Sequence, residues 1–321
     1  MQRLALVESW DLTRAHTMTR PRSASDYPAH DTQQACAIRE VLTDSICHTP
    51  ATVFDAVSAR IATEVGFRTG ILAGSIASHV QLAAPDWIVL TLSELAQCVR
   101  TICRASPISL VVDADHGFGN PLNVVRTVEE LEHAGAQGIT IEDTALPAAF
   151  GSHGKEFLIS RAEAKAKMRA ALHARSKPQT VIVGRTSCLR IEGLEETIYR
   201  LQSFEQCGVD ALMVIGLQDE SQLAAIARAT ELPLFCGPVP ASLNAERLAA
   251  HRVRWRITGH HAYAIAMQAL YQAYAELHKR GSTADYTLAQ ASATDLQRWM
   301  RGESFAHMQQ AFMQDSQGEA A

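Results

Sequence analysis

The 321-residue sequence has no CxxC pair and no apolar run of the length that a membrane span requires. Its seven cysteines are scattered, which disfavours a disulfide framework or a zinc site and favours thiols in a reducing cytoplasm. A net charge of −5 gives no reason to expect a nucleic acid or an anionic membrane as a partner. The first residues lack the positive region, apolar core and cleavage site of a secretory signal. We therefore expect a globular, cytoplasmic protein.

A dinucleotide-binding fold is also disfavoured, because no G-x-G-x-x-G motif follows the first predicted strand. Short β-branched runs instead alternate with amphipathic segments, and the number of alternations is close to that of a closed barrel. We predict an α/β fold, a (β/α)8 TIM-type barrel with extra C-terminal helices. Residues 1–27 are predicted to be a disordered or loose extension and residues 28–280 the barrel. Residues 281–321 should form a helical segment that packs on a neighbouring subunit.

The most informative stretch is residues 108–143, which has the pattern of strand, loop, helix and strand. Asp113 and Asp115 end the first of these strands at positions i and i+2, which share one face of a strand. Glu142 ends the next strand. The carboxyl ends of parallel strands meet at one edge, so we expect the three carboxylates to converge and to need a cation. Such oxygen ligands suit Mg²⁺ or Mn²⁺ completed by water, whereas the alternative is a set of solvated loop acids or helix N-caps.

Three more polar residues come directly after predicted strands. Ser75 lies among small residues and could offer its hydroxyl and N–H groups to a carboxylate, although an ordinary tight turn is the alternative. Arg185 suits an anion clamp for a carboxylate, against the alternative of a surface salt bridge. His260 has the strand-end position of a catalytic or substrate-binding group, against the alternative of a lone histidine without such a role. Asp86, considered alone, has the features of an N-cap or a surface acid.

The sequence resembles the isocitrate lyase/phosphoenolpyruvate mutase superfamily over about residues 44–275. The resemblance rests on Gly74-Ser75, Asp86, DADHGFGN at 113–120, TIED at 140–143 and Gly184-Arg185-Thr186. Within the superfamily it is most similar to the oxaloacetate decarboxylase branch. That similarity rests on SIAS at 75–78 with AAPD at 83–86, on ALPAAFG at 145–151 and on Gly259-His260.

The resemblance implies an activity and an assembly. The activity is Mg²⁺-dependent decarboxylation of oxaloacetate, or of a 3-alkyl oxaloacetate, to pyruvate and CO₂ through a metal-stabilised enolate. The partner is thus a small 2-oxo dicarboxylic acid. Many members are tetramers that exchange a C-terminal helix between subunits, so a homotetramer is expected.

The resemblance also assigns roles to residues. Asp113 is expected to bind Mg²⁺ (or Mn²⁺) directly, and the water ligands of the ion are expected to be held by Asp86, Asp115 and Glu142. Substrate contact is expected from Ser75, Arg185 and His260, the last two of which are also the expected catalytic residues.

The loop at residues 144–160 bears on the alternatives. Its length is typical of a functional loop, often a lid. Isocitrate and methylisocitrate lyases carry a cysteine there, whereas FGSHGK at 150–155 has none and also lacks the Asn or Thr of a phosphonopyruvate-type reaction. A carbon–carbon lyase on 2-methylisocitrate-like acids and a phosphonopyruvate hydrolase are therefore weaker alternatives. A barrel that binds a 2-oxo acid without turnover is the non-enzymatic one.

Overall fold

The computed structural model describes residues 34–281 and 289–313. Within them, eight parallel strands follow one another in chain order in one sheet. They are β1 (Ala51–Thr52), β2 (Thr69–Leu72), β3 (Ser109–Asp113), β4 (Gly138–Glu142), β5 (Val181–Thr186), β6 (Ala211–Val214), β7 (Leu234–Cys236) and β8 (Val253–Arg256). A parallel bridge between His48 and Trp255 joins β8 to the segment before β1. The His48 N–H donates to the Arg254 carbonyl at 2.8 Å, and the Arg256 N–H donates to the His48 carbonyl at 2.9 Å. The predicted barrel is therefore confirmed.

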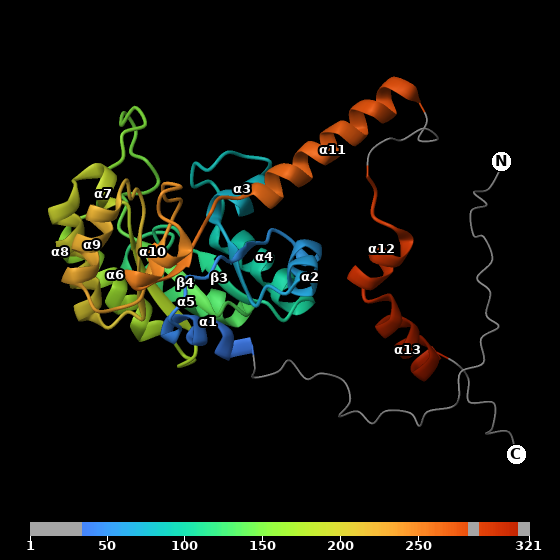
Figure 1. The fold of residues 1–321 in the computed structure, drawn as a ribbon, viewed down its shortest axis with the longest axis horizontal. Helices are drawn as coiled ribbons and strands as arrows, with labels where there is room; N and C mark the ends of the chain where they lie inside the picture. Colours follow the sequence, from blue (N-terminus) through green and yellow to red (C-terminus); the bar gives the residue numbers. More distant parts are fainter. Residues whose placement is uncertain (1–33, 282–288, 314–321) are drawn as a thin grey trace, which may run out of the picture. The chain divides into compact units, whose positions relative to one another are not determined.

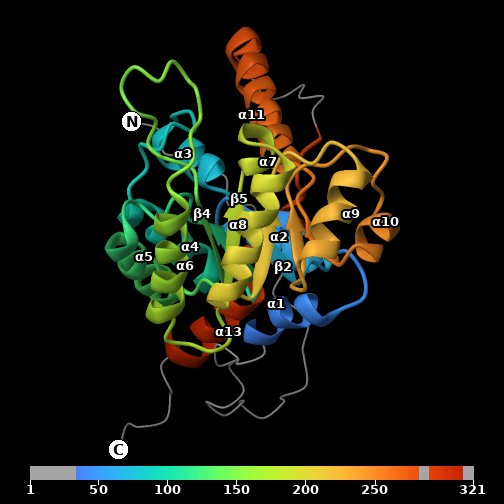
Figure 2. The same cartoon turned by 90° about the vertical axis from the view of Figure 1, so that its left-hand side faces the viewer.

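Helices surround the strands (Figures 1 and 2). Those within the barrel are α1 (Gln34–Thr43), α2 (Ala56–Val65), α3 (Gly74–Leu82), α4 (Leu92–Ala105), α5 (Pro121–Ala134), α6 (Arg161–Ala174), α7 (Cys188–Ile191), α8 (Leu194–Cys207), α9 (Glu220–Ala229) and α10 (Ala245–Ala250). After the last strand come α11 (His261–Arg280), α12 (Ala293–Trp299) and α13 (Gly302–Met313). In both views α1 lies at one end of the barrel, and α3, α7 and the β4–α6 loop lie at the other.

The core has two layers because side chains alternate across each strand. The inward-facing layer fills the barrel with apolar side chains that include Ile71, Val111, Val183, Met213, Phe235 and Trp255. Ile38 and Val41 of α1 belong to the same cluster, so α1 closes the end of the barrel where the strands begin. The outward-facing layer packs strands against the surrounding helices. The barrel interior is thus filled, which leaves the carboxyl ends of the strands to carry polar groups.

The structure refines two local predictions and contradicts a third. The small residues at 74–78, for which an ordinary tight turn was the alternative, are the start of α3, so Ser75 lies in the first turn of a helix. The prediction that Ser93 caps the helix at residues 93–105 was wrong, because Thr91, two residues earlier, forms a reciprocal capping box with Glu94 and leaves Ser93 inside α4. The helical segment predicted at residues 281–321 contains two helices among its described residues, α12 and α13, separated at Arg301, whose φ of 61° is left-handed. The short helices α7 and α10, and α9, had not been predicted.

Two predicted segments fall wholly or partly outside the residues described. The extension at 1–27 lies outside them, as do residues 282–288 and 314–321 of the predicted C-terminal segment. The proposed division of the chain at residues 27 and 280 stays a prediction. Across residues 34–281 and 289–313, no helix combines the length and the apolar character needed to cross a membrane.

Candidate active site

The carboxyl ends of three neighbouring strands bring together Asp113, Glu142 and Arg185. Asp113 ends β3, Glu142 ends β4, and Arg185 of β5 is paired in register with Glu142. The Arg185 guanidinium forms ion pairs with Asp113 through Nη1 and with Glu142 through Nε, the latter at 3.0 Å. The three side chains are only 16%, 15% and 5% exposed for Arg185, Asp113 and Glu142 respectively. The predicted strand-end acids and the predicted anion clamp therefore lie in one place.

Asp113 is held from two sides. The Thr140 hydroxyl donates to Asp113 Oδ1 at 2.9 Å, and the Asp115 N–H donates to the same oxygen at 3.3 Å. Asp113 Oδ2 faces Arg185. Thr140 was not among the predicted site residues, although its place two residues before Glu142 on β4 gives it the same facing.

Asp115 reaches the site by a route that the strand pattern did not predict. It lies beyond β3 in a turn with a left-handed φ of 48°, so the two-residue period of a strand does not apply to it. Its carbonyl accepts the Glu142 N–H at 2.8 Å, which ties the turn to β4. Its carboxylate lies against Gly74 at the start of α3. The prediction that Asp113 and Asp115 share a strand face was therefore wrong.

Burial and like charge shape the electrostatics of this cluster. Burial, and then the neighbouring Asp113 and Glu142, raise the pKa of Asp115 well above its usual range. Burial also raises the pKa of Glu142, although Arg185 opposes the shift. Burial disfavours the charge of Arg185, but Asp113 and Glu142 more than compensate and raise its pKa. One guanidinium facing three carboxylates leaves an excess of negative charge, which a divalent cation would balance.

The donor set suits a hard cation that keeps several water ligands. Glu142 Oε2 is buried and makes no hydrogen bond, although it lies 3.0 Å from Arg185 Nε in the ion pair described above. Within the described ranges, no group of three or more His, Cys, Asp or Glu side chains is arranged to hold a metal directly. Such a site fits an ion with few direct protein ligands and several waters, which is the usual mode for Mg²⁺.

Asp86 and Ser75 lie on the α3 side of the cluster. Asp86 lies on the surface between α3 and α4, and partial burial together with the charge of Asp113 raises its pKa. Ser75 lies in the first turn of α3, and Ala73 at the N-cap offers no side-chain hydrogen bond. The first N–H groups of α3 therefore have no side-chain acceptor at the N-cap, and the helix dipole favours an anion there.

His260 lies at the N-cap of α11. Its Nδ1 is 3.1 Å from the hydroxyl of Thr52, the last residue of β1. Burial is the main cause that lowers the pKa of His260, so its ring is neutral near pH 7.

An aromatic group that the sequence analysis missed lies beside His260. The Tyr263 ring is 5.4 Å from Phe54 and 5.6 Å from His79, measured between ring centroids. His79 follows Ser75 by four residues on α3, a spacing that places both on one helix face. That spacing was the available signal in the sequence.

Two buried cations from the outer helices were also missed. Lys167 of α6 donates from Nζ to the carbonyl of His116, the residue after Asp115, at 2.8 Å. Arg200 of α8 pairs with Asp143, the residue after Glu142, at 3.0 Å. The signal was a charged residue on the apolar stripe of each helix, since Lys167 is flanked by the buried Ala164, Met168 and Ala171.

Comparison with known proteins gives consistent relatives. A model of the phosphoenolpyruvate phosphomutase family matches residues 39–278. An oxaloacetate decarboxylase of Rhodopseudomonas palustris is 44% identical over 278 residues, which cover 86% of this chain and 96% of that protein. An oxaloacetate decarboxylase of Bradyrhizobium diazoefficiens is 47% identical over 265 residues, which cover 82% of this chain and 91% of that protein.

Solved structures share the fold at lower identity. A phosphonopyruvate hydrolase in complex with oxalate and Mg²⁺ has a TM-score of 0.77 at 26% identity, and the match covers 88% of this chain and 99% of that one. An oxaloacetate acetylhydrolase in complex with the inhibitor 3,3-difluorooxalacetate has a TM-score of 0.78 at 25% identity, with coverage of 88% and 98%.

Proposed function

The chain belongs to the phosphoenolpyruvate phosphomutase family, and we propose that it decarboxylates oxaloacetate, or a 3-alkyl oxaloacetate, to CO₂ and the corresponding 2-oxo acid. The resemblance to this superfamily and to its oxaloacetate decarboxylase branch is thereby confirmed. The observation that carries the proposal is the identity of 44% and 47% to oxaloacetate decarboxylases over most of both chains. The buried acids and the arginine at the strand ends support it.

We propose Mg²⁺ as the cofactor, with Mn²⁺ as a functional substitute because both prefer oxygen ligands. Asp113 would bind the ion directly, and Asp86, Asp115 and Glu142 would hold the water ligands of the ion. When bound, the ion supplies Lewis acidity toward the 2-oxo group of the substrate. The related hydrolase solved with oxalate and Mg²⁺ supports this choice.

Arg185 and Ser75 would bind and orient the carboxylate next to the 2-oxo group. Arg185 offers a buried, permanently charged fork, and Ser75 offers its hydroxyl and the N–H groups of the first α3 turn. Holding the substrate in one orientation removes part of the entropic barrier. As CO₂ departs, negative charge moves onto the 2-oxo oxygen, where the Arg185 charge stabilises it most in the transition state. The enolate that remains would take a proton at C3 from a water molecule or from His260, which gives the 2-oxo acid.

His260 would orient the departing carboxylate. If the Thr52 hydroxyl donates to Nδ1, the neutral ring carries its proton on Nε2 and can donate a hydrogen bond to that carboxylate. A neutral donor suits this step. A charged imidazolium would stabilise the carboxylate before it is lost and would therefore slow decarboxylation.

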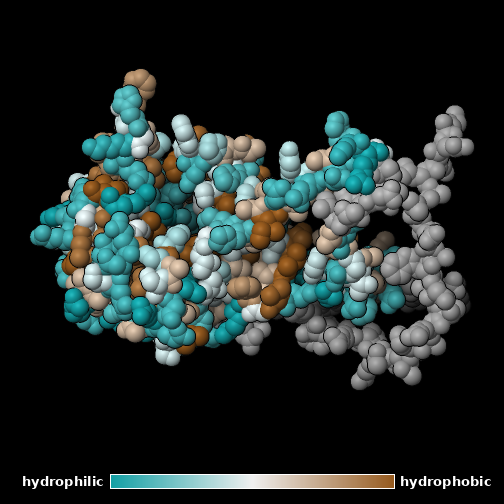
Figure 3. Space-filling view, turned by 45° about the horizontal axis from the view of Figure 1, so that its top comes forward, coloured by the Kyte–Doolittle hydropathy of each residue, from teal (hydrophilic) through white to brown (hydrophobic). Residues whose placement is uncertain are grey.

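We also propose that the protein is a homotetramer whose C-terminal helices pack on neighbouring subunits. α11 has no buried residue, and Ile265, Tyr271 and Tyr274 on it are each more than 60% exposed. An apolar cavity of about 450 Å³ lies between β1, α2 and the start of α11, and Phe54 and Ile61 are among the residues that line it. Hydrophobic residues also reach the surface on the face seen in Figure 3. A partner helix would bury such surface. A cytoplasmic location stays a prediction from the scattered cysteines.

The experiment that tests the activity measures CO₂ and pyruvate release from oxaloacetate by the purified protein, with Mg²⁺ and after chelation. The rate with Mg²⁺ alone is subtracted. We expect chelator-sensitive turnover that Arg185→Ala lowers by about 10³-fold or more, because the variant loses the charge that stabilises the transition state. Arg68→Ala is the control, since its exposed ion pair with Glu40 lies at the other end of the barrel.

The same assay separates the alternatives. An absence of turnover above the background would contradict the proposal, and cleavage of 2-methylisocitrate or phosphonopyruvate would then identify the alternative enzyme. Oxalate mimics the pyruvate enolate, so it should inhibit the decarboxylase competitively. A 2-oxo acid binding protein would bind oxalate without any turnover to inhibit.

A further inference from the structure

The residues directly behind the site form a second buried layer. Glu142 and Arg185 pair in register at the ends of β4 and β5, so the residues that follow them, Asp143 and Thr186, fall on the opposite, outward side. Both are fully buried. Burial raises the pKa of Asp143, while the neighbouring Thr186 hydroxyl and the charge of Arg200 lower it. The outer layer is therefore polar where the barrel core is otherwise apolar.

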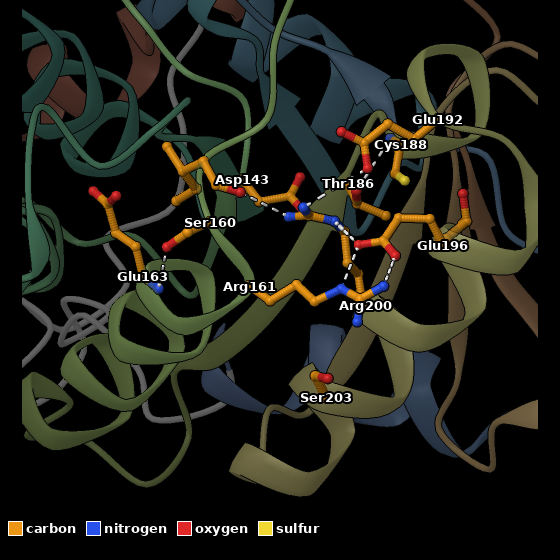
Figure 4. Close-up of polar contacts among 12 residues, drawn as sticks. Asp143, Ser160, Arg161, Glu163, Thr186, Cys188, Glu192, Glu196, Arg200 and Ser203 are labelled. Carbon is orange, nitrogen blue, oxygen red and sulfur yellow. Dashed lines mark hydrogen bonds and ion pairs between the residues drawn. The ribbon is translucent and has the colours of Figure 1, made fainter.

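Arg200 of α8 joins the two ends of the β4–α6 loop (Figure 4). Its Nη1 donates to Asp143 Oδ2 at 3.0 Å and to the Ile159 carbonyl at 3.1 Å. Asp143 precedes the loop and Ile159 ends it, and the Ile159 N–H donates to the Asp143 carbonyl at 2.9 Å. A bridge between Thr144 and Leu158 continues this pairing into the loop. The Arg200 side chain therefore holds together the two chain segments that flank the loop of residues 144–158.

The contacts extend from Arg200 to the start of α6. Arg200 Nε is 2.9 Å from Glu196 Oε1, and that oxygen also accepts from Arg161 Nε at 2.9 Å. The Arg161 guanidinium lies over the Tyr199 ring, 3.8 Å from its centroid. Both arginines approach Glu196 in Figure 4. The first turn of α6 is therefore fixed to α8 through the same glutamate that orients Arg200.

A buried ion pair is weak support for stability, because the desolvation of both charges offsets most of their attraction. Arg200 instead contributes hydrogen bonds in fixed directions. Its planar fork meets three acceptors in fixed directions, and a lysine ammonium on a flexible stem cannot do the same. The clamp acts on Asp143, which is bonded covalently to Glu142.

We propose that Arg200 is a positioning residue of the active site. By clamping Asp143 and Ile159, it fixes the Glu142 carboxylate for the divalent cation and anchors both ends of the 144–158 loop. The first part rests on the proposed function, because it needs Glu142 to hold a water ligand of the ion. The second part rests on the contacts at the loop base alone.

The test uses Arg200→Lys, which keeps the charge and removes the fork. Mn²⁺ binding is measured without substrate from the electron paramagnetic resonance signal of the free ion. We expect the Kd to rise by about 10-fold or more, the range observed when residues behind metal ligands are changed. Tryptic cleavage after Lys155 in the loop, followed by mass spectrometry, should be at least several-fold faster than in the wild type.

Arg175→Lys is the matched control. Arg175 also pairs with an aspartate, the partly buried Asp210, at 2.7 Å and donates to a carbonyl, that of Thr180 at 3.3 Å, but it does so where the strands begin. We expect Arg175→Lys to lower the stability of the protein without changing its Mn²⁺ affinity or the rate of loop cleavage. Should Arg200→Lys fail to fold, Asp143→Asn tests the same clamp, because it removes the charge pair and keeps the side-chain shape.

Mn²⁺ binding tests whether Arg200 fixes Glu142, and tryptic cleavage tests whether Arg200 anchors the loop. Wild-type Mn²⁺ affinity and wild-type loop cleavage in a folded Arg200→Lys protein would overturn the inference. A wild-type protein that binds no Mn²⁺ would instead contradict the proposed metal site, and the comparison of tryptic cleavage would then decide whether Arg200 clamps the loop.

Discussion

The Asp115 carboxylate occupies the place where a side chain on Gly74 would begin. A Cβ atom on Gly74 would lie 2.6 Å from Asp115 Oδ2 and 3.0 Å from Oδ1. Gly74 starts α3, and Asp115 follows β3, so the contact joins two neighbouring units of the barrel. The φ of Gly74 is not left-handed, so its backbone conformation does not require glycine. The close approach of the Asp115 carboxylate does.

The first prediction concerns Gly74→Ala. The added methyl group should displace the Asp115 carboxylate and raise the Mg²⁺ concentration needed for half-maximal activity by about 10-fold or more. Stability should change by no more than about 1 kcal/mol, because alanine favours a helix over glycine by a similar amount. Activity against Mg²⁺ concentration and urea unfolding measure the two effects. Gly70→Ala is the control, since its Cβ would meet the end of the Ile108 side chain at 2.8 Å and the Ala51 carbonyl oxygen at 3.3 Å, neither of which belongs to the acid cluster.

The second prediction concerns the pH dependence of turnover. Burial lowers the pKa of His260, so the neutral ring persists to a pH below the usual histidine value of about 6.5. If the neutral form is required, kcat/KM should stay level on acidification through pH 6.5 and fall only below it. Thr52→Val should lower kcat by about 10-fold, because Nδ1 loses the partner that orients the ring.

The pH profile of His260→Gln provides the control for that assignment. The groups whose charges act on His260 are Asp113, His79, His261 and Asp86. A fall in kcat/KM that persists unchanged in His260→Gln belongs to another group, and the assignment to His260 would then be wrong.

The third prediction concerns stability against pH. Burial lowers the pKa of His116 to about 4, and the unfolded chain titrates near 6.5. Between these values the unfolded state binds more protons than the folded state, so acid lowers stability. At pH 5 the cost is about 2 kcal/mol relative to pH 7.5. Urea unfolding should show the difference between wild type and His116→Asn shrinking by that amount at pH 5. His133→Asn, on the exposed face of α5, should show no such change.

The fourth prediction concerns Asp210, which precedes β6 at the end opposite the site. Its carboxylate accepts from Arg39 at 2.6 Å, from Arg175 at 2.7 Å and from the Ile182 N–H at 2.8 Å. Asp210→Ala should lower the free energy of unfolding by about 2–3 kcal/mol, less than for a fully buried pair because both arginines are partly exposed. Activity per folded molecule should stay unchanged. A loss of activity without a loss of stability would contradict this division of the barrel.

Much of the framework followed from the sequence. Strand and helix periods differ, so the alternation along the chain predicted the barrel, and the ends of the predicted strands predicted that Asp113 and Glu142 converge and that Arg185 stands at the same edge. The register of β4 and β5 pairs Glu142 with Arg185 directly. Helix starts were less predictable, because Thr91 and Ser93 both qualify as caps and only the reciprocal bond with Glu94 selects the first.

Tertiary structure decided how the predicted residues meet. The Arg185–Asp113 pair joins residues 72 positions apart, and the Arg200–Asp143 pair joins residues 57 positions apart. Local periodicity carries no signal for such contacts, since they depend on how the barrel closes and on which outer helix covers which strand. The contact of the Asp115 carboxylate with Gly74 likewise joins two separate units of the barrel. The sequence thus determined which groups stand at the strand ends, whereas only the closed fold decided which of them touch, because contact is set by packing between strands and helices that are far apart along the chain.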